Sequence, residues 1–122
     1  MHLTQFPEIP DAWRNDALAE DWAKIREHRA GVTGAIEVMR KDKQIGSSLQ
    51  AVAIISSEAA SVLDDLELWA EICITSTAMS GAQNGGAIAP GQKCERCWRV
   101  LSEVGADQKH PTLCRRCCEA VE

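Results

Sequence analysis

Two Cys-x-x-Cys pairs near the end of the chain are the residues best suited to chemistry. Cys94 and Cys97 form the first pair, Cys114 and Cys117 form the second, and 16 residues separate the two. A two-residue spacer folds into a tight turn that directs both sulfurs to one point, and zinc prefers four tetrahedral ligands. A loop of about 15–20 residues between two such turns completes a four-cysteine cage. The spacing therefore predicts one zinc ion held by these four thiolates.

A zinc site with four protein ligands is structural, because no position remains for water or substrate. Disulfides would need an oxidising compartment, and a redox Cys-x-x-Cys would not need a second pair. An iron–sulfur cluster could also use four cysteines, but zinc is favoured. Only 31 residues follow position 91. We therefore expect this segment to need its ion to fold, since zinc contributes roughly 10–16 kcal/mol in comparable peptides.

Three further residues are of a type that can bind zinc, but only two of them are close enough in sequence to the four cysteines to be alternative ligands. Cys118 adjoins Cys117 and could compete as a ligand, although a three-residue spacer suits zinc less well. His110 could replace a thiolate, form a turn before Pro111 or contact RNA. Cys73 lies in an apolar stretch and is expected to be a small buried hydrophobic residue.

Basic residues surround the four cysteines, and a zinc ion would gather them in space. Residues 92–118 carry 6 Lys and Arg against 3 Asp and Glu, whereas residues 1–91 carry 7 against 13. The cysteine-rich end, rather than the whole chain, is therefore suited to nucleic acid. Trp98 could stack on an unpaired base, worth about 1–3 kcal/mol, or could be the large core residue of the unit. Both interpretations of Trp98 remain open at this point.

An apolar stripe at helical spacing follows the proline-containing start of the chain. Its members are Leu18, Trp22, Ile25, Arg29, Val32, Ile36 and Met39. The pattern predicts one long core-packing helix, capped by Asn15 or Asp16 and ended by Gly46. The stem of Arg29 could lie along the apolar face.

Two strands and a second helix are expected after this helix. Residues 49–55 form a short apolar, partly β-branched run that predicts a buried strand. Ser57 is the expected cap of a helix with Leu63, Leu66 and either Trp69 or Ala70 on one face. Residues 73–77 are the candidate second strand. Helix, strand, helix, strand predicts an α+β fold built as a small α/β layer. The direction of the two strands stays open, although a β-α-β crossover would make them parallel.

The chain is expected to divide into two domains. Residues 80–92 hold four glycines and one proline without periodicity, which indicates a flexible linker. The predicted organisation is an α/β domain over 1–79, this linker over 80–92, and a four-cysteine zinc finger over 93–122.

The composition suits an ordinary globular protein, with 45% hydrophobic and 25% charged residues. No apolar run approaches the roughly 18–20 residues that span a bilayer, and the N-terminus has no signal-peptide pattern. We expect a cytoplasmic monomer that does not contact membranes.

Residues 93–117, KCERCWRVLSEVGADQKHPTLCRRC, resemble the C-terminal zinc finger of bacterial isoleucyl-tRNA synthetases, a finger type shared with formamidopyrimidine-DNA glycosylases. The resemblance extends upstream through HLTQFPEIPDAW and residues 21–55, which are similar to the end of that family's anticodon-binding region. There a helix ends in Lys-x-Ile-Gly-Ser-Ser before a strand. LELWAEICITS resembles the helix and strand that follow. Residues 78–92 depart from the family, which often has another strand there.

The resemblance implies binding of isoleucine tRNA near its anticodon stem-loop, in support of ATP-dependent charging by the catalytic remainder of the enzyme. Cys94, Cys97, Cys114 and Cys117 match the zinc ligands. Arg96, Trp98 and Arg116 match the finger's signature. The residues expected to contact RNA are Arg96, Trp98, Arg99, Arg115, Arg116, Arg40 and Lys43, the last two in the helix-end motif.

We expect this chain to be part of an isoleucine-tRNA ligase but not catalytic alone, because its sequence lacks the family's His-Ile-Gly-His and Lys-Met-Ser-Lys-Ser motifs. An alternative is a free-standing zinc-dependent module that binds protein, which the net charge of −6 over residues 1–91 favours. A DNA-binding finger like that of the glycosylase is a third possibility. Chemistry on DNA would, however, require the glycosylase's catalytic N-terminal region, which we do not expect in this chain.

Overall fold

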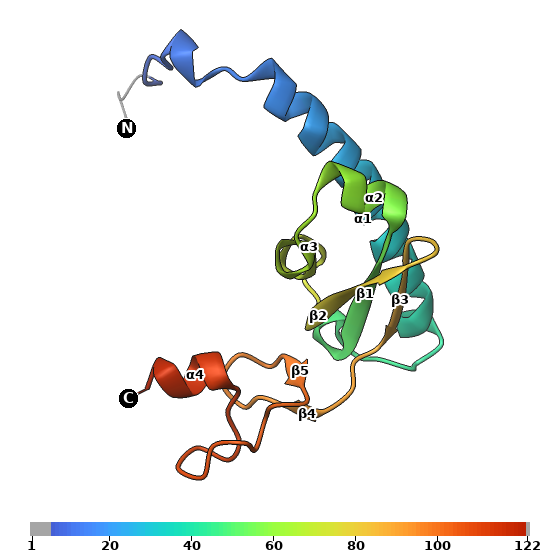
Figure 1. Ribbon diagram of the computed structural model, residues 1–122, viewed down its shortest axis with the longest axis vertical. Helices are drawn as coiled ribbons and strands as arrows, with labels where there is room; N and C mark the ends of the chain where they lie inside the picture. The colour runs from blue at the N-terminus through green and yellow to red at the C-terminus, as the bar shows by residue number, and fades with distance from the viewer. Residues whose placement is uncertain (1–5, 122) are drawn as a thin grey trace, which may run out of the picture.

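The computed structural model describes residues 6–121 and places a cysteine-rich segment below a layer of helices and strands (Figure 1). The upper layer has a 3-10 turn at Asp11–Trp13, then α1 (Asp16–Lys41), a second 3-10 turn (Ser48–Gln50), β1 (Ala51–Ser56), α2 (Ser57–Val62), α3 (Leu66–Cys73), β2 (Thr77–Gly81) and β3 (Gly85–Ile88). The lower segment has β4 (Gln92–Lys93), β5 (Val100–Leu101) and α4 (Arg115–Glu119). The predicted fold class, a small α/β layer followed by a four-cysteine unit, is confirmed.

Helix α1 begins where the sequence predicts and ends earlier. The side-chain oxygen of Asn15 accepts a hydrogen bond from the backbone N–H of Leu18 at 3.0 Å, which confirms the expected cap. At the other end, Lys43 has a φ of 59° and donates to the Arg40 carbonyl, while Gln44 donates to the Met39 carbonyl. This pair of bonds is a Schellman motif, which ends the helix at Lys41. The prediction that Gly46 ends the helix is therefore wrong.

Only the middle and end of the α1 stripe reach the core. Ile25, Val32 and Ile36 are buried, whereas Leu18 and Trp22 are 51% and 38% exposed. The reason is length: 26 helical residues span about 39 Å, and a six-residue strand spans about 20 Å. The first turns of α1 consequently extend past the sheet, as Figure 1 shows.

Two side chains on the predicted stripes join the helices by polar contacts to backbone. Arg29 is half-buried, and its Nε donates to the carbonyl of Ile72 at 2.7 Å, near the end of α3. The side chain of Trp69 is fully buried, and its Nε1 donates to the carbonyl of Leu63 at 2.8 Å. The predicted core position of Trp69 is therefore confirmed, with its indole N–H satisfied.

The expected second helix is two short helices. The Ser56 hydroxyl caps α2 by accepting from the N–H of Ala59, so the expected cap at Ser57 is displaced by one residue. Asp65 caps α3 through a 3.0 Å bond from the Leu68 N–H and thereby restarts the helix. A left-handed residue, Ile74, follows α3, so the second strand begins at Thr77 and the prediction of a strand over 73–77 is wrong.

The sheet has three strands in the order β2-β1-β3. β1 and β2 are parallel, with Val52 opposite Thr77, which is the direction that a β-α-β crossover gives. β3 pairs antiparallel with β1, with Ala51 opposite Ile88, and had no counterpart in the sequence prediction. Residues 80–92 are thus largely ordered as sheet, and the prediction of a flexible linker is wrong for Gly85–Ile88.

The glycines of this segment serve close packing instead of flexibility. A Cβ atom on Gly81 would overlap Cγ2 of Ile54, and one on Gly86 would lie 2.8 Å from Cγ1 of Ile36. Glycine here lets α1 and β1 approach the neighbouring strands. The domain boundaries at 79 and 93 remain predictions. None of the helices between residues 6 and 121 has the length and apolar content that crossing a membrane requires.

Gly86→Ala should lower the free energy of unfolding by about 1–3 kcal/mol, because the added methyl group overpacks the contact with Ile36. Gly34→Ala is the matched control: a Cβ there has no atom within 4 Å, and the site is an exposed helix interior. The free energy of unfolding of Gly34→Ala should rise by up to about 1 kcal/mol. Urea unfolding of the zinc-loaded chain measures both, and equal effects would contradict the packing argument.

Candidate zinc centre and nucleic-acid interface

Each Cys-x-x-Cys pair forms a tight turn supported by backbone hydrogen bonds. In the first, between β4 and β5, Trp98 donates its N–H to the Cys94 carbonyl, and Cys94 donates to the Arg99 carbonyl, both at 2.9 Å. In the second, Cys114 is the N-cap of α4 and its carbonyl accepts from the N–H of Cys117 at 2.9 Å. The first pair is therefore held in a turn between β4 and β5, and the second pair at the N-terminal end of α4.

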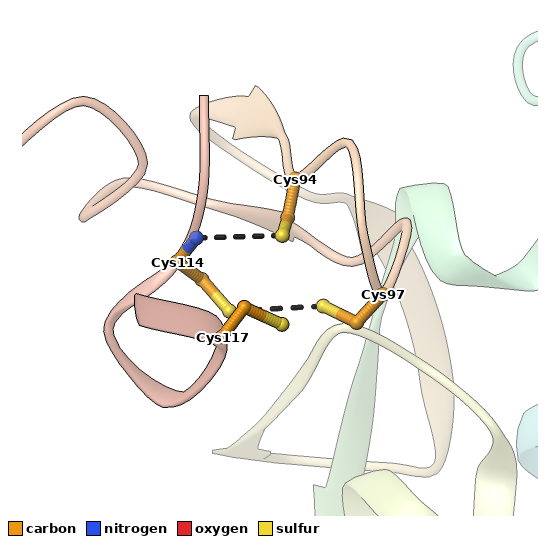
Figure 2. A group of neighbouring side chains, drawn as sticks. All are labelled: Cys94, Cys97, Cys114 and Cys117. Carbon is orange, nitrogen blue, oxygen red and sulfur yellow. Dashed lines mark hydrogen bonds between the residues drawn. The ribbon is translucent and has the colours of Figure 1, made fainter. Parts of the chain in front are cut away.

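The four side chains point toward a common centre, as Figure 2 shows. Their sulfur atoms all lie within 4.8 Å of one another, and the Sγ atoms of Cys97 and Cys114 are 3.7 Å apart. Sulfurs about 2.3 Å from a tetrahedral zinc lie about 3.8 Å from each other. A zinc ion therefore fits at the centre with little adjustment, held by Cys94, Cys97, Cys114 and Cys117.

The protein around the sulfurs supplies donors that suit thiolates. The backbone N–H of Cys114 donates to Sγ of Cys94 at 3.4 Å, and Nη1 of Arg96 lies 3.8 Å from Sγ of Cys117. Burial opposes ionisation of Cys94, but backbone N–H groups of Cys97, Cys114 and Arg96 outweigh it and lower the pKa of Cys94 to about 6. Burial, with hydrogen bonds between the thiols, raises the pKa of Cys114 to about 12. Near neutral pH and without metal, these shifts favour a thiolate at Cys94 beside a protonated thiol at Cys114.

The other candidate ligands lie outside this cluster. Sγ of Cys118 is 4.0 Å from the carbonyls of His110 and Leu113, and Cys118 is not among the four converging sulfurs. His110 donates its backbone N–H to Asp107 in a loop turn. Cys73 is buried in the apolar core beside α1, and this burial raises the pKa of its thiol. A structural role for Cys73 as a small hydrophobic residue is confirmed.

Trp98 lies at the surface of the finger rather than in its core. Its side chain is 61% exposed, its backbone has a φ of 67°, and Nζ of Lys93 lies 5.1 Å from its ring centroid. A left-handed backbone costs a bulky residue roughly 1–2 kcal/mol. The ring recovers little of that cost by burial, which favours the interpretation of Trp98 as a binding platform. Lys93, five residues earlier, was not among the expected RNA contacts.

The arginines expected to contact RNA differ in how far they are already engaged. Arg96 approaches the zinc thiolate, and the half-buried Arg99 donates to the carbonyl of Ser76 in the upper layer. Arg115 is exposed and pairs with Glu119 at 3.3 Å. Arg116 is also exposed, and among residues 6–121 the structure gives it no hydrogen-bond or ion-pair partner. No pattern in the sequence indicates this contact between Arg99 and Ser76.

Arg40 and Lys43 lie at the C-terminal end of α1, apart from the finger's own arginines. They border a hollow of about 440 Å³ together with Lys41, Ile45 and Gly46. Arg40 pairs with Glu37 at 3.0 Å, and Lys43 is exposed. In Figure 1 this end of α1 and the finger lie toward the same end of the molecule, away from the N-terminus.

The fold and the site together define a protein with a closed four-cysteine zinc finger joined to a small α/β layer. Residues 91–120 match the protein family described as "Zinc finger found in FPG and IleRS". The four cysteines form the site of one structural zinc ion, as predicted.

Beyond the finger, the chain is similar to isoleucine–tRNA ligases along nearly its whole length. It is 41% identical to that of Agrobacterium fabrum over 95% of the chain, and 42% identical to that of Gluconobacter oxydans over 99%. The ligase of Geobacter sulfurreducens is 36% identical over the full chain. The chain spans only 14–15% of the length of these relatives. The predicted resemblance to the C-terminal region of this enzyme is thereby confirmed.

Replacing Cys114 by serine should remove the zinc, because one of four converging sulfurs is lost and the unit has little other core. Cys118→Ser is the matched control, since that buried neighbour lies outside the cluster. It should keep close to one zinc per chain. Metal analysis by mass spectrometry of both variants measures the difference, and full retention in Cys114→Ser would contradict the assignment.

Zinc affinity should rise with pH. With a pKa of about 12, the Cys114 thiol holds a proton that zinc must displace at neutral pH, whereas Cys94 competes for protons only as the pH falls toward about 6. Each displaced proton changes the affinity about tenfold per pH unit. The zinc affinity can be measured by competition against a chelator between pH 6 and 8. An indicator dye follows the protons that zinc binding releases. An affinity that does not vary with pH would show that the thiols are ionised before zinc binds.

Proposed function

We propose that this chain is the tRNA-binding, zinc-bearing part of an isoleucine–tRNA ligase, and that it binds isoleucine tRNA near its anticodon stem-loop. The observation that carries the proposal is the similarity to isoleucine–tRNA ligases over 95% or more of the chain. In this role the chain supports ATP-dependent charging of the tRNA with isoleucine, while the active site lies in the catalytic remainder of the enzyme.

The surface of the finger supports a contact with single-stranded RNA. An exposed indole beside a lysine offers a face on which a base can stack, with a cation close enough to reach its phosphate. Arg115 and Arg116 add positive charge on α4. Arg40 and Lys43 supply a second group of cations at the end of α1, which suits an RNA that extends past the finger. The zinc ion supplies only the framework that presents these residues.

The catalytic remainder of such an enzyme is the second proposed partner. Large apolar side chains remain exposed on the segment that precedes and begins α1: Phe6, Ile9, Trp13, Leu18 and Trp22. A row of this kind on one segment is typical of a surface that another protein part covers. The same row, with the acidic charge of residues 1–91, is also what the alternative of a free-standing protein-binding module would use.

Trp98→Gly should weaken binding of isoleucine tRNA by about 1–3 kcal/mol. Glycine accepts the left-handed backbone at this position without strain, so the finger should keep its zinc and only the ring is lost. Trp13→Gly is the control, since it removes an exposed indole outside the finger. Filter binding or fluorescence anisotropy, with zinc content measured in parallel, gives the comparison.

Binding of the unmodified chain should also weaken with salt, with a slope of roughly −0.7 per single-strand phosphate neutralised. Equal affinity for any tRNA would contradict the specific form of the proposal. A complete lack of tRNA retention at low salt would favour the protein-binding alternative. These two outcomes are separate from the effect of Trp98, which concerns the surface that makes the contact.

A further inference from the structure

Ser76 is a fully buried polar residue at the junction between the upper layer and the finger. It directly precedes β2, and its backbone N–H donates to the carbonyl of Ala51 at 3.1 Å. Its hydroxyl donates to the carbonyl of Leu49 at 2.5 Å. Two of its polar groups thus attach it to the 3-10 turn before β1 and to the first residue of β1.

The remaining hydrogen-bonding capacity of Ser76 is used by the finger. The backbone N–H of Val100 donates to the Ser76 hydroxyl at 2.6 Å, and Nε of Arg99 donates to the Ser76 carbonyl at 2.9 Å. Nη2 of Arg99 contacts the same carbonyl. Every polar group of this residue is therefore engaged, some on the layer and some on the finger. A buried network of this kind is costly to leave partly unpaired.

The covalent connection between the two parts is short. Only residues 89–91 separate β3 from β4, and the N–H of Ala89 donates to the carbonyl of Gln50 at 2.8 Å. Gly91 has a φ of 112°, and a Cβ atom there would overlap the carbonyl group of Leu101. This connection fixes where the chain enters the finger. A single attachment leaves rotation about it, and the contacts of Ser76 with Arg99 and Val100 provide a second attachment.

We propose that Arg99 is a positioning residue that fixes the orientation of the zinc finger on the α/β layer through Ser76, instead of contacting RNA itself. Its consequence for tRNA rests on the function proposed above: the fixed orientation holds Trp98 and Arg116 on the same RNA as the cations at the end of α1. Arg99 directly follows Trp98 in the sequence. In this proposal the exposed indole of Trp98 contacts RNA, and the half-buried guanidinium of Arg99 orients the finger.

The experiment compares Arg99→Gln, Arg99→Lys and the charge-matched control Arg26→Gln in the zinc-loaded full chain. Arg26 is exposed on α1, so its substitution removes the same charge away from the junction. Zinc content and amide chemical-shift dispersion are measured first. Residual dipolar couplings of the backbone amides then report how the two parts are oriented, which a change in finger stability alone would not alter.

In the unmodified chain and in Arg26→Gln, one alignment tensor should fit the couplings of both parts. In Arg99→Gln, with zinc retained, the finger and the layer should need separate tensors. Arg99→Lys should behave the same way, because an ammonium group keeps the charge but cannot reproduce the two contacts of a guanidinium with one carbonyl. A single unchanged tensor in both Arg99 variants would overturn the proposal. Loss of zinc or of a folded finger in both would also overturn it, since Arg99 would then serve folding rather than orientation.

The tRNA measurement separates this proposal from the one on which it rests. If Arg99 positions the finger, both Arg99 variants should lose tRNA affinity by a similar factor, several-fold larger than Arg26→Gln. If Arg99 instead contacts a phosphate, Arg99→Lys should retain most of the affinity and a single tensor, which contradicts the proposal. If the unmodified chain binds no tRNA, the proposed function fails, while the dipolar couplings still decide whether Arg99 orients the finger.

Discussion

The convergence of four thiolates is the constraint on which the cysteine-rich end depends. Its buried cluster consists of Val104 and three of the zinc ligands, with Leu101, Leu113 and Cys97 partly buried beside it. So few apolar side chains cannot offset the conformational entropy of ordering some thirty residues. Bonds to one ion replace the core that this segment lacks, and its arginines and Trp98 are placed relative to one another only because the two turns are held together.

The upper layer is held together without a metal, by an apolar core in which helix and strand backbones approach closely. Gly86 leaves room for Ile36, so that α1 lies directly against the three-stranded sheet, and Gly81 leaves room for Ile54 of the adjacent strand β1. This explains why composition misled the prediction for residues 80–92. Glycine signals both flexible chain and close contact, and only knowledge of the facing side chain separates the two. Strand β3, which was not predicted from the sequence, is separated from β4 of the finger by only three residues.

The zinc ligands, a cap at Asn15 or Asp16 and the buried positions of α1 from Ile25 onward could be predicted from sequence. Each depends on residues close together in the chain or on a strong periodic pattern. The misplaced features depend on contacts between distant residues. Leu18 and Trp22 have helical spacing, but the sheet ends before it reaches them. The Schellman motif at Lys43 uses a residue that rarely adopts a left-handed backbone, so no residue preference indicates it.

The arginines show why counting charge overstates a nucleic-acid surface. Sequence alone treats Arg96, Arg99, Arg115 and Arg116 alike, since each lies beside a cysteine turn. In the folded chain Arg96 approaches a zinc thiolate, and Arg99 is held by a carbonyl of the upper layer. A guanidinium already satisfied in this way gains less from a phosphate, because it must first give up existing hydrogen bonds. Among these cations, Arg116 on α4 is exposed and unpaired among the described residues, and Lys93 lies beside the exposed indole of Trp98. Under the proposed function, a finger with so few available cations would gain specificity from where it is held, so its attachment to the α/β layer would matter for tRNA binding as much as its charge.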